Sequence, residues 1–162
     1  MTIFGKPLSE YVRFAAVFIG LVIVVGIVRL ALSLSGVPNS TTKWFSMTAV
    51  GWIGIFYYSV RVHTSGFGSY KQLLPVLALV NFAAQVIAMA AIAMAIFTGA
   101  DNIFSAPEYA FGSDGKTWTH FVAHLFIGTA AGSLVAWAFG SLIMFVSKKL
   151  FPGNRKTAAA RA

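Results

Sequence analysis

The sequence contains no cysteine and has few charged residues. Only 10% of its 162 residues are charged, and only four of these are acidic. Without cysteine there is no disulfide framework, no thiolate metal site and no thiol nucleophile. Soluble domains carry about 25% charged residues, so this chain is too poor in charge to be one. Its hydrophobic content of 58% excludes disorder and predicts an integral membrane protein.

Four long hydrophobic runs dominate the chain. A bilayer core is about 30 Å thick, which takes about 20 apolar residues to cross as a helix. Because lipid offers no hydrogen bonds to the backbone, such runs are expected to be helices. They cover approximately residues 14–34, 44–62, 73–97 and 118–147. We therefore expect an all-α bundle of four transmembrane helices within residues 1–152, followed by a basic, flexible tail at 153–162.

The basic residues are unevenly divided between the ends of these runs. With the N-terminus inside, nine of the twelve lysines and arginines lie on the inner side. Cytoplasmic flanks retain such residues, so we expect both termini in the cytoplasm and a multi-pass protein of the inner membrane. Anionic lipid head groups are the expected partners of this basic face, and no nucleic-acid motif is present. The head-group residues predicted here are Arg61, Lys71, Lys148 and Lys149.

A stripe of small residues runs along the last hydrophobic segment at a spacing of four. It contains Gly128, Gly132 and Gly140, the first two forming a G-x-x-x-G motif. In lipid, small residues let helix backbones approach closely. The stripe therefore predicts helix packing, either within the chain or against a second copy or a larger membrane partner. A second interpretation is that the glycines make room for a flat cofactor beside a histidine.

Two histidines lie one helical turn apart in the same segment. His120 and His124 can both point at one metal ion, and a carboxylate such as Glu108 from the acidic loop could complete the site. The metal and the cofactor considered for this site are zinc and haem b. Two histidines of one chain are not expected on a single haem, since His63 belongs to the opposite side of the membrane. The alternative is that His120 lies at head-group level and His124 hydrogen-bonds a neighbouring helix.

Three further polar residues lie inside the hydrophobic runs. Arg29 either extends toward the surface or pairs with Glu108 or Asp101 to hold the long loop on the bundle. Asn81 and Gln85 are four residues apart in the third run. Amides are costly in lipid, so these two predict either interhelical hydrogen bonds or the lining of a solute pathway.

The residues do not assemble into a recognisable catalytic set. Nucleophile, base and orienting group do not occur together, and the dinucleotide and P-loop fingerprints are absent from the sequence. The leading hypothesis is a small non-catalytic membrane protein that packs with itself or a larger partner through the glycine face. The alternatives are metal or haem binding by His120 and His124, and transport of a small solute past Asn81 and Gln85.

Overall fold

The computed structural model describes residues 1–110 and 112–150, so the predicted tail at 153–162 lies outside the described residues. Apart from two strands of two residues each, every regular element described is helical, which confirms the all-α class. The helices are α1 (Leu8–Leu34), α2 (Asn39–Thr42), α3 (Met47–Thr64), α4 (Tyr70–Thr98), the 3₁₀ helix η1 (Pro107–Tyr109), α5 (Trp118–Ala123), the π-helix η2 (His124–Ala131) and α6 (Gly132–Leu150).

A small hairpin precedes the first helix. Its strands, β1 (Thr2–Ile3) and β2 (Lys6–Pro7), pair antiparallel through a turn in which Phe4 and Gly5 both have positive φ, 46° and 84°. Two positive φ values are typical of the tight turns that match strand twist. The hydroxyl of Tyr11 donates to the carbonyl oxygen of Ile3 at 2.9 Å. This bond ties the hairpin to the first turn of α1.

Three helices in the described part of the chain are long and apolar enough to cross a membrane. They are α1, α4 and the continuous helix from Trp118 to Leu150 formed by α5, η2 and α6. These findings indicate a multi-pass membrane protein. The fourth expected crossing, at 44–62, corresponds to α3, which is 18 residues long and carries Arg61 and His63 in its last turn. It is not among the three.

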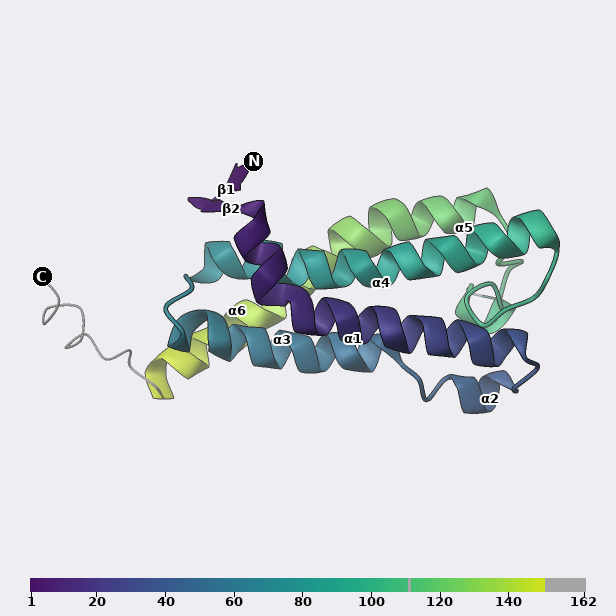
Figure 1. The fold of residues 1–162 in the computed structure, drawn as a ribbon, viewed down its shortest axis with the longest axis horizontal. Coiled ribbons are helices and arrows are strands. Elements are labelled where there is room, and N and C mark those ends of the chain that lie inside the picture. Colours follow the sequence, from purple (N-terminus) through teal and green to yellow (C-terminus); the bar gives the residue numbers. More distant parts are fainter. Residues whose placement is uncertain (111, 151–162) are drawn as a thin grey trace, which may run out of the picture.

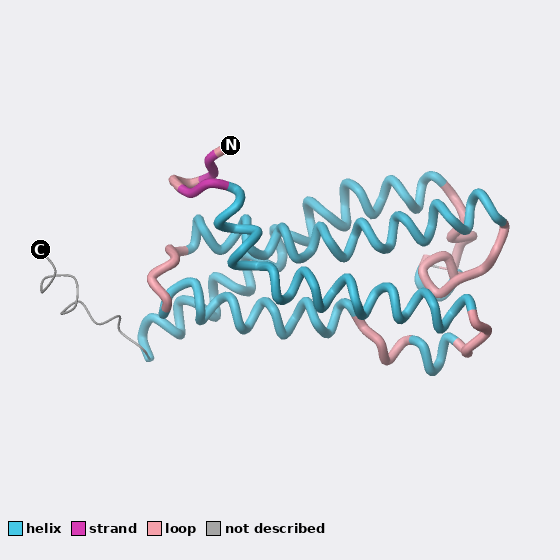
Figure 2. The backbone as a smooth tube through the Cα atoms, viewed as in Figure 1, coloured by secondary structure: helices cyan, strands magenta, loops and turns pink. Residues whose placement is uncertain are grey.

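The long helices lie side by side in one bundle (Figure 1). α1 packs on α4, α4 also packs on η2 and α6, and α3 packs on α1, α4 and α6. The hairpin, the loop from α3 to α4 and the last turn of α6 lie at one end, and α2 and the loop after α4 lie at the other (Figures 1 and 2). We call these the hairpin end and the loop end.

The core follows α4, which carries more fully buried side chains than any other described helix. At the hairpin end the loop between α3 and α4 closes the bundle with an aromatic side chain. Phe67 stacks on Phe14 with ring centroids 3.9 Å apart, and its edge meets Tyr11. The indole of Trp137 donates to the carbonyl oxygen of Tyr70 at 2.7 Å, which joins α6 to the start of α4.

Candidate functional site

A cavity of about 480 Å³ lies in the half of the bundle nearer the loop end. Its walls come from α1, α3, α4, the last helix and the loop after α4, and they are mostly apolar. A volume of this size is within the range of small-molecule sites, which are apolar with a few convergent polar groups. The polar side chains that line it are Arg29, Thr48, Asn81, Gln85, Tyr109 and His124.

The glycines of the last helix face α4 and α3 of the same chain. A Cβ atom on Gly128 would lie 2.5 Å from Oε1 of Gln85, and one on Gly132 would lie 3.2 Å from Nδ2 of Asn81. At Gly140 a Cβ would lie 2.8 Å from the hydroxyl of Ser59. The glycine stripe thus accommodates side chains of its own bundle, as the within-chain interpretation expects. The amides of Gln85 and Asn81 lie beside Gly128 and Gly132, and both glycines also line the cavity.

A chain of hydrogen bonds joins α4 to the last helix along one wall of the cavity. Nδ2 of Asn81 donates to the carbonyl oxygens of Gly128 (2.9 Å) and Thr129 (3.2 Å) and to the hydroxyl of Ser133 (3.0 Å). Nε2 of Gln85 donates to Oδ1 of Asn81 at 3.2 Å, and Oε1 of Gln85 lies 2.6 Å from Nδ1 of His124. The interhelical hydrogen bonds expected for both amides are therefore present.

The chain of bonds also determines the protonation of His124. Backbone carbonyl oxygens only accept, so Asn81 must present its nitrogen to them and its oxygen to Gln85. Gln85 in turn presents its nitrogen to Asn81 and its oxygen to His124. An amide oxygen has no proton to give, so Nδ1 of His124 carries the hydrogen. In the neutral ring Nε2 then holds the free lone pair.

The last helix is π-helical where this wall forms. From His124 to Ala131 the helix widens, and the hydroxyl of Thr129 donates to the carbonyl oxygen of His124 at 3.2 Å. π-Helical turns are rare and occur often at functional sites. The predicted fourth span is thus a single helix from Trp118 to Leu150 with a wide turn at the histidine, a feature that the hydrophobic pattern did not indicate.

The two histidines lie together, but the third ligand expected for a metal is elsewhere. The rings of His120 and His124 have centroids 4.9 Å apart, and Nδ1 of His120 lies 2.9 Å from the carbonyl oxygen of Gly115. Glu108 instead accepts a hydrogen bond from Nδ2 of Asn39 at 2.7 Å. Within residues 1–110 and 112–150, no three His, Asp or Glu side chains gather as a possible metal site. Zinc usually needs three or four protein ligands, and this pair supplies two.

Arg29 does not form the expected pair with a loop carboxylate. Its guanidinium lies over the rings of Phe104, at 5.2 Å, and Tyr109, at 5.3 Å. The two carboxylates proposed as its partners bind Asn39 and Lys116 instead. The prediction of an ion pair was therefore wrong, although Arg29 does contact the loop through aromatic faces. Its Nε atom is buried and has no hydrogen-bond partner among the described residues.

The loop from Gly99 to Thr117 folds inward over the end of the cavity. Ile103 is fully buried, and its backbone N–H donates to the hydroxyl of Ser33 on α1 at 2.8 Å. Asn102 is 3% exposed and donates to the carbonyl oxygen of Ala91 on α4 at 2.9 Å. Both Ile103 and Phe104 line the cavity. This loop is therefore a lid that is anchored to two helices.

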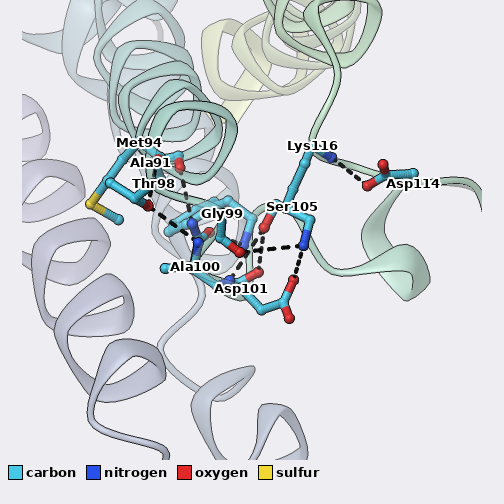
Figure 3. A network of polar contacts seen from close by, with 11 residues as sticks. Ala91, Met94, Thr98, Gly99, Ala100, Asp101, Ser105, Asp114 and Lys116 are labelled. Carbon is cyan, nitrogen blue, oxygen red and sulfur yellow. Dashed lines mark hydrogen bonds and ion pairs between the residues drawn. The ribbon is translucent and has the colours of Figure 1, made fainter.

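An ion pair closes the base of the lid. Nζ of Lys116 lies 2.7 Å from Oδ1 of Asp101, and its backbone N–H donates to Asp114 (Figure 3). The hydrogen bond and charge of Asp101 raise the pKa of Lys116 above its ordinary 10.5. The hydrogen bond from Asn39 lowers the pKa of Glu108 below its ordinary 4.5. Both pairs are solvent-exposed, so each adds little stability.

The predicted head-group residues lie at the hairpin end. Three of the four rest on aromatic rings: Arg61 over Phe14 and Tyr57, with a 2.6 Å hydrogen bond to the Tyr57 hydroxyl, Lys148 3.9 Å from the Tyr70 centroid, and Lys149 4.6 Å from that of Phe145. Lys71 is exposed. Their ammonium and guanidinium groups are thus held at the end of the bundle, where such side chains combine an apolar contact with access to polar surroundings.

Several residues of the cavity were not predicted from the sequence. Trp52, Phe104 and Tyr109 were not singled out from the sequence, yet all three line the space. The sequence offered only a weak signal for them, namely the two small residues Gly51 and Gly54 on either side of Trp52. Phe104 belongs to a stretch of the long loop, Asn102–Ala106, that is buried throughout.

Comparison with protein-family models, with curated protein sequences and with solved structures gives no match to this chain. The site is therefore interpreted from its own geometry.

Proposed function

We propose that the chain crosses the inner membrane four times with both ends in the cytoplasm. The hairpin and the last described turn of α6 lie at the same end of the bundle, which supports an even number of crossings (Figure 1). The same end carries Lys6, Arg61, Lys71, Lys148 and Lys149, as the positive-inside rule expects. At about 1.5 Å per residue, α3 is about 27 Å long, close to the thickness of a bilayer core.

Reporter fusions test this topology. Alkaline phosphatase, which is active only outside the cytoplasm, is fused after Ala162 and, separately, within the lid after Ser113. We expect activity for the lid fusion and none for the C-terminal fusion. Activity at Ala162 contradicts the four-crossing arrangement. It also removes the reason to expect anionic lipid head groups as partners of the hairpin end.

We propose that the function of this protein is to bind a small, largely apolar molecule in the cavity beneath the lid. The observation that carries the proposal is the cavity itself: about 480 Å³, lined by apolar side chains and by polar groups from four helices and the lid. A close-packed interior contains few voids larger than a water molecule. A space of this size, held open by glycines and roofed by an anchored loop, is what a ligand site requires.

Entry from the bilayer is consistent with the rim of the cavity. Thr48 and Trp52 on α3 and Val135 on α6 all line it and are exposed, Trp52 by 41% and Val135 by 53%. These residues lie on α3 and α6, and the two helices are in contact where the rings of Trp52 and Phe139 meet edge to face. The lid covers the other side. An apolar molecule dissolved in lipid therefore has a lateral route between α3 and the last helix.

A matched pair of glycine variants tests the binding function. Gly51 lines the cavity and Gly20 does not, and a Cβ at either position meets nothing within 4 Å. The protein is placed in nanodiscs of phosphatidylcholine, and retention of radiolabelled decanol is measured against empty nanodiscs. We expect saturable binding that is lost in Gly51→Leu and retained in Gly20→Leu. Equal retention in the two variants, or none in the wild type, overturns the proposal.

Metal binding by the histidine pair is a second candidate, favoured by one specific observation. Nδ1 of each ring faces a carbonyl-type oxygen, Gly115 O for His120 and Gln85 Oε1 for His124. Ligating histidines almost always donate the second ring N–H in this way, which leaves Nε2 for the metal. Elemental analysis for zinc and an absorption spectrum for haem b, on wild type and on His120→Ala/His124→Ala, test it. Equal metal content in the two proteins counts against the site.

The structure limits how two of the hypotheses from the sequence, association with a partner and solute transport, could operate. Packing against a second copy or a larger membrane complex has to use the outward face of the bundle, because the three glycines contact their own chain. Particle mass in detergent, for wild type and for the outward-facing Phe82→Ala variant, tests that association. Solute transport past Asn81 and Gln85 remains compatible with the cavity, and flux of the bound molecule into liposomes tests it.

A further inference from the structure

Among the residues that the structure describes, Arg29 is the one charged side chain that lines the cavity. It lies on α1 close to the loop end, with its guanidinium between the lid rings of Phe104 and Tyr109. Its Nε atom is buried and makes no hydrogen bond with any described residue. Donors of this kind are costly to bury unless a partner satisfies them.

Within residues 1–110 and 112–150, no carboxylate pairs with this arginine. All four carboxylate side chains fall within the described residues, and each is engaged by another group. The engaged pairs are Glu10 with Lys6, Asp101 with Lys116, Glu108 with Asn39, and Asp114 with the backbone N–H of Lys116. Arg29 is half-buried, and a charge in such a position is unfavourable without an anion, whereas a satisfied pair is tolerated. The missing anion is therefore expected from outside the chain.

We infer that the molecule bound in the cavity is an amphiphile with a single carboxylate, which pairs with Arg29, and an apolar body. This inference rests on the proposed binding function. A guanidinium offers parallel N–H donors that match the two oxygens of a carboxylate. One positive charge neutralises one negative charge, so a dianionic phosphate would leave an uncompensated charge in an apolar space.

The shape of the site places the two parts of such a ligand. The carboxylate lies under the lid, where Arg29 meets Phe104 and Tyr109. The apolar body extends toward the middle of the bundle, where the lining includes Ile55 and Leu77, both less than a tenth exposed. The hydrogen-bonded amides of α4 form one side wall. The rim at Trp52 allows a chain dissolved in the bilayer to enter tail or head first.

Binding of three probes to the protein in phosphatidylcholine nanodiscs tests the inference: decanoate, decanol and acetate. Charge-assisted hydrogen bonds are stronger than neutral ones by an amount that corresponds to about ten-fold in affinity. We expect saturable decanoate binding at least ten-fold tighter than decanol, without competition from acetate. Arg29→Gln should reduce decanoate affinity to that of decanol or below it and leave decanol affinity unchanged, with Arg29→Lys intermediate for decanoate.

Lys43→Gln is the matched control, because Lys43 is also a cation near the loop end but does not line the cavity. It should leave the affinities for decanoate and decanol as in the wild type. Equal affinities for the two long-chain probes in the wild type overturn the carboxylate inference and leave the binding function standing. Failure of both probes to bind overturns both. Loss of decanol affinity in Arg29→Gln also contradicts the inference, since the arginine then acts by shaping the cavity.

Discussion

Nδ1 of His124 lies 2.6 Å from Oε1 of Gln85, and this contact joins the π-helical turn of the last helix to the middle of α4. The backbone carbonyls that accept from Asn81 set the orientation of both amides, so the histidine is held with its hydrogen on Nδ1. An imidazole held in one tautomer at the wall of a cavity presents its other nitrogen in a defined chemical state. The side-chain amides of Asn81 and Gln85 therefore serve to position the His124 ring.

Replacing Gln85 by leucine should destabilise the protein by about 1–3 kcal/mol. The change removes the acceptor of the His124 N–H and the donor to Asn81, and a half-buried donor left without a partner costs its desolvation energy. Chemical unfolding followed by tryptophan fluorescence measures the loss. Val86→Leu on the neighbouring, exposed face of α4 is the control and should change stability little. A Gln85→Leu protein as stable as the control contradicts the assigned network.

Replacing Gly128 by alanine should be costly although alanine favours helices. The new Cβ would lie 2.5 Å from Oε1 of Gln85, so the amide must leave His124 or the helices must separate. Overpacking of this kind costs about 1–3 kcal/mol. Gly20→Ala is the matched control, because a Cβ there meets nothing within 4 Å. Thermal unfolding in one detergent compares the two, and an equal or higher midpoint for Gly128→Ala argues against close packing at this glycine.

Much of the fold could be predicted from hydrophobic run length. The four predicted runs coincide with α1, α3, α4 and the helix from Trp118 to Leu150, because burial in an apolar medium favours helices wherever such runs occur. The boundaries were less predictable. α1 begins at Leu8, well before the expected 14, because Glu10 and Arg13 continue the helix beyond the apolar stretch. Charge at a helix end does not interrupt its hydrogen bonding.

Only the polar residues of the site could be predicted from the sequence. Asn81, Gln85 and His124 could be identified because polar groups in an apolar run need partners, and the structure brings these three together. The cavity could not be identified, since it depends on how far α3 diverges from the last helix. The partner of Arg29 was also mispredicted. Its guanidinium lies over aromatic rings of the lid, and charge counting does not reveal such contacts.

The bond between Asn39 and Glu108 should make a small, acid-sensitive contribution to the attachment of α2 to the lid. The pKa of Glu108 is lowered in the folded protein, so its stabilising effect is complete above the ordinary value of 4.5 and disappears as the pH falls through the folded value. The unfolding midpoints of wild type and Asn39→Ala should therefore differ at pH 6 and converge below pH 4.5. Glu108→Gln, which does not ionise, is the control. A difference that persists in acid contradicts the assignment.

Substitution of Gly115 should release the lid. A Cβ at this position would collide with the backbone carbonyl of Ser105, which lies in the buried part of the lid and cannot rotate away as a side chain can. The backbone at Gly115 does not have a positive φ, so the cost of alanine there is steric. In Gly115→Ala we expect faster proteolytic cleavage between Gly99 and Thr117 and weaker retention of the cavity ligand, with the helices intact by circular dichroism. Ser113→Ala removes only a hydroxyl that donates to Ala110 within the same loop, and it should leave cleavage near the wild-type rate. If Gly115→Ala is cleaved no faster than this control, the lid is not held by the close approach of Gly115 to Ser105.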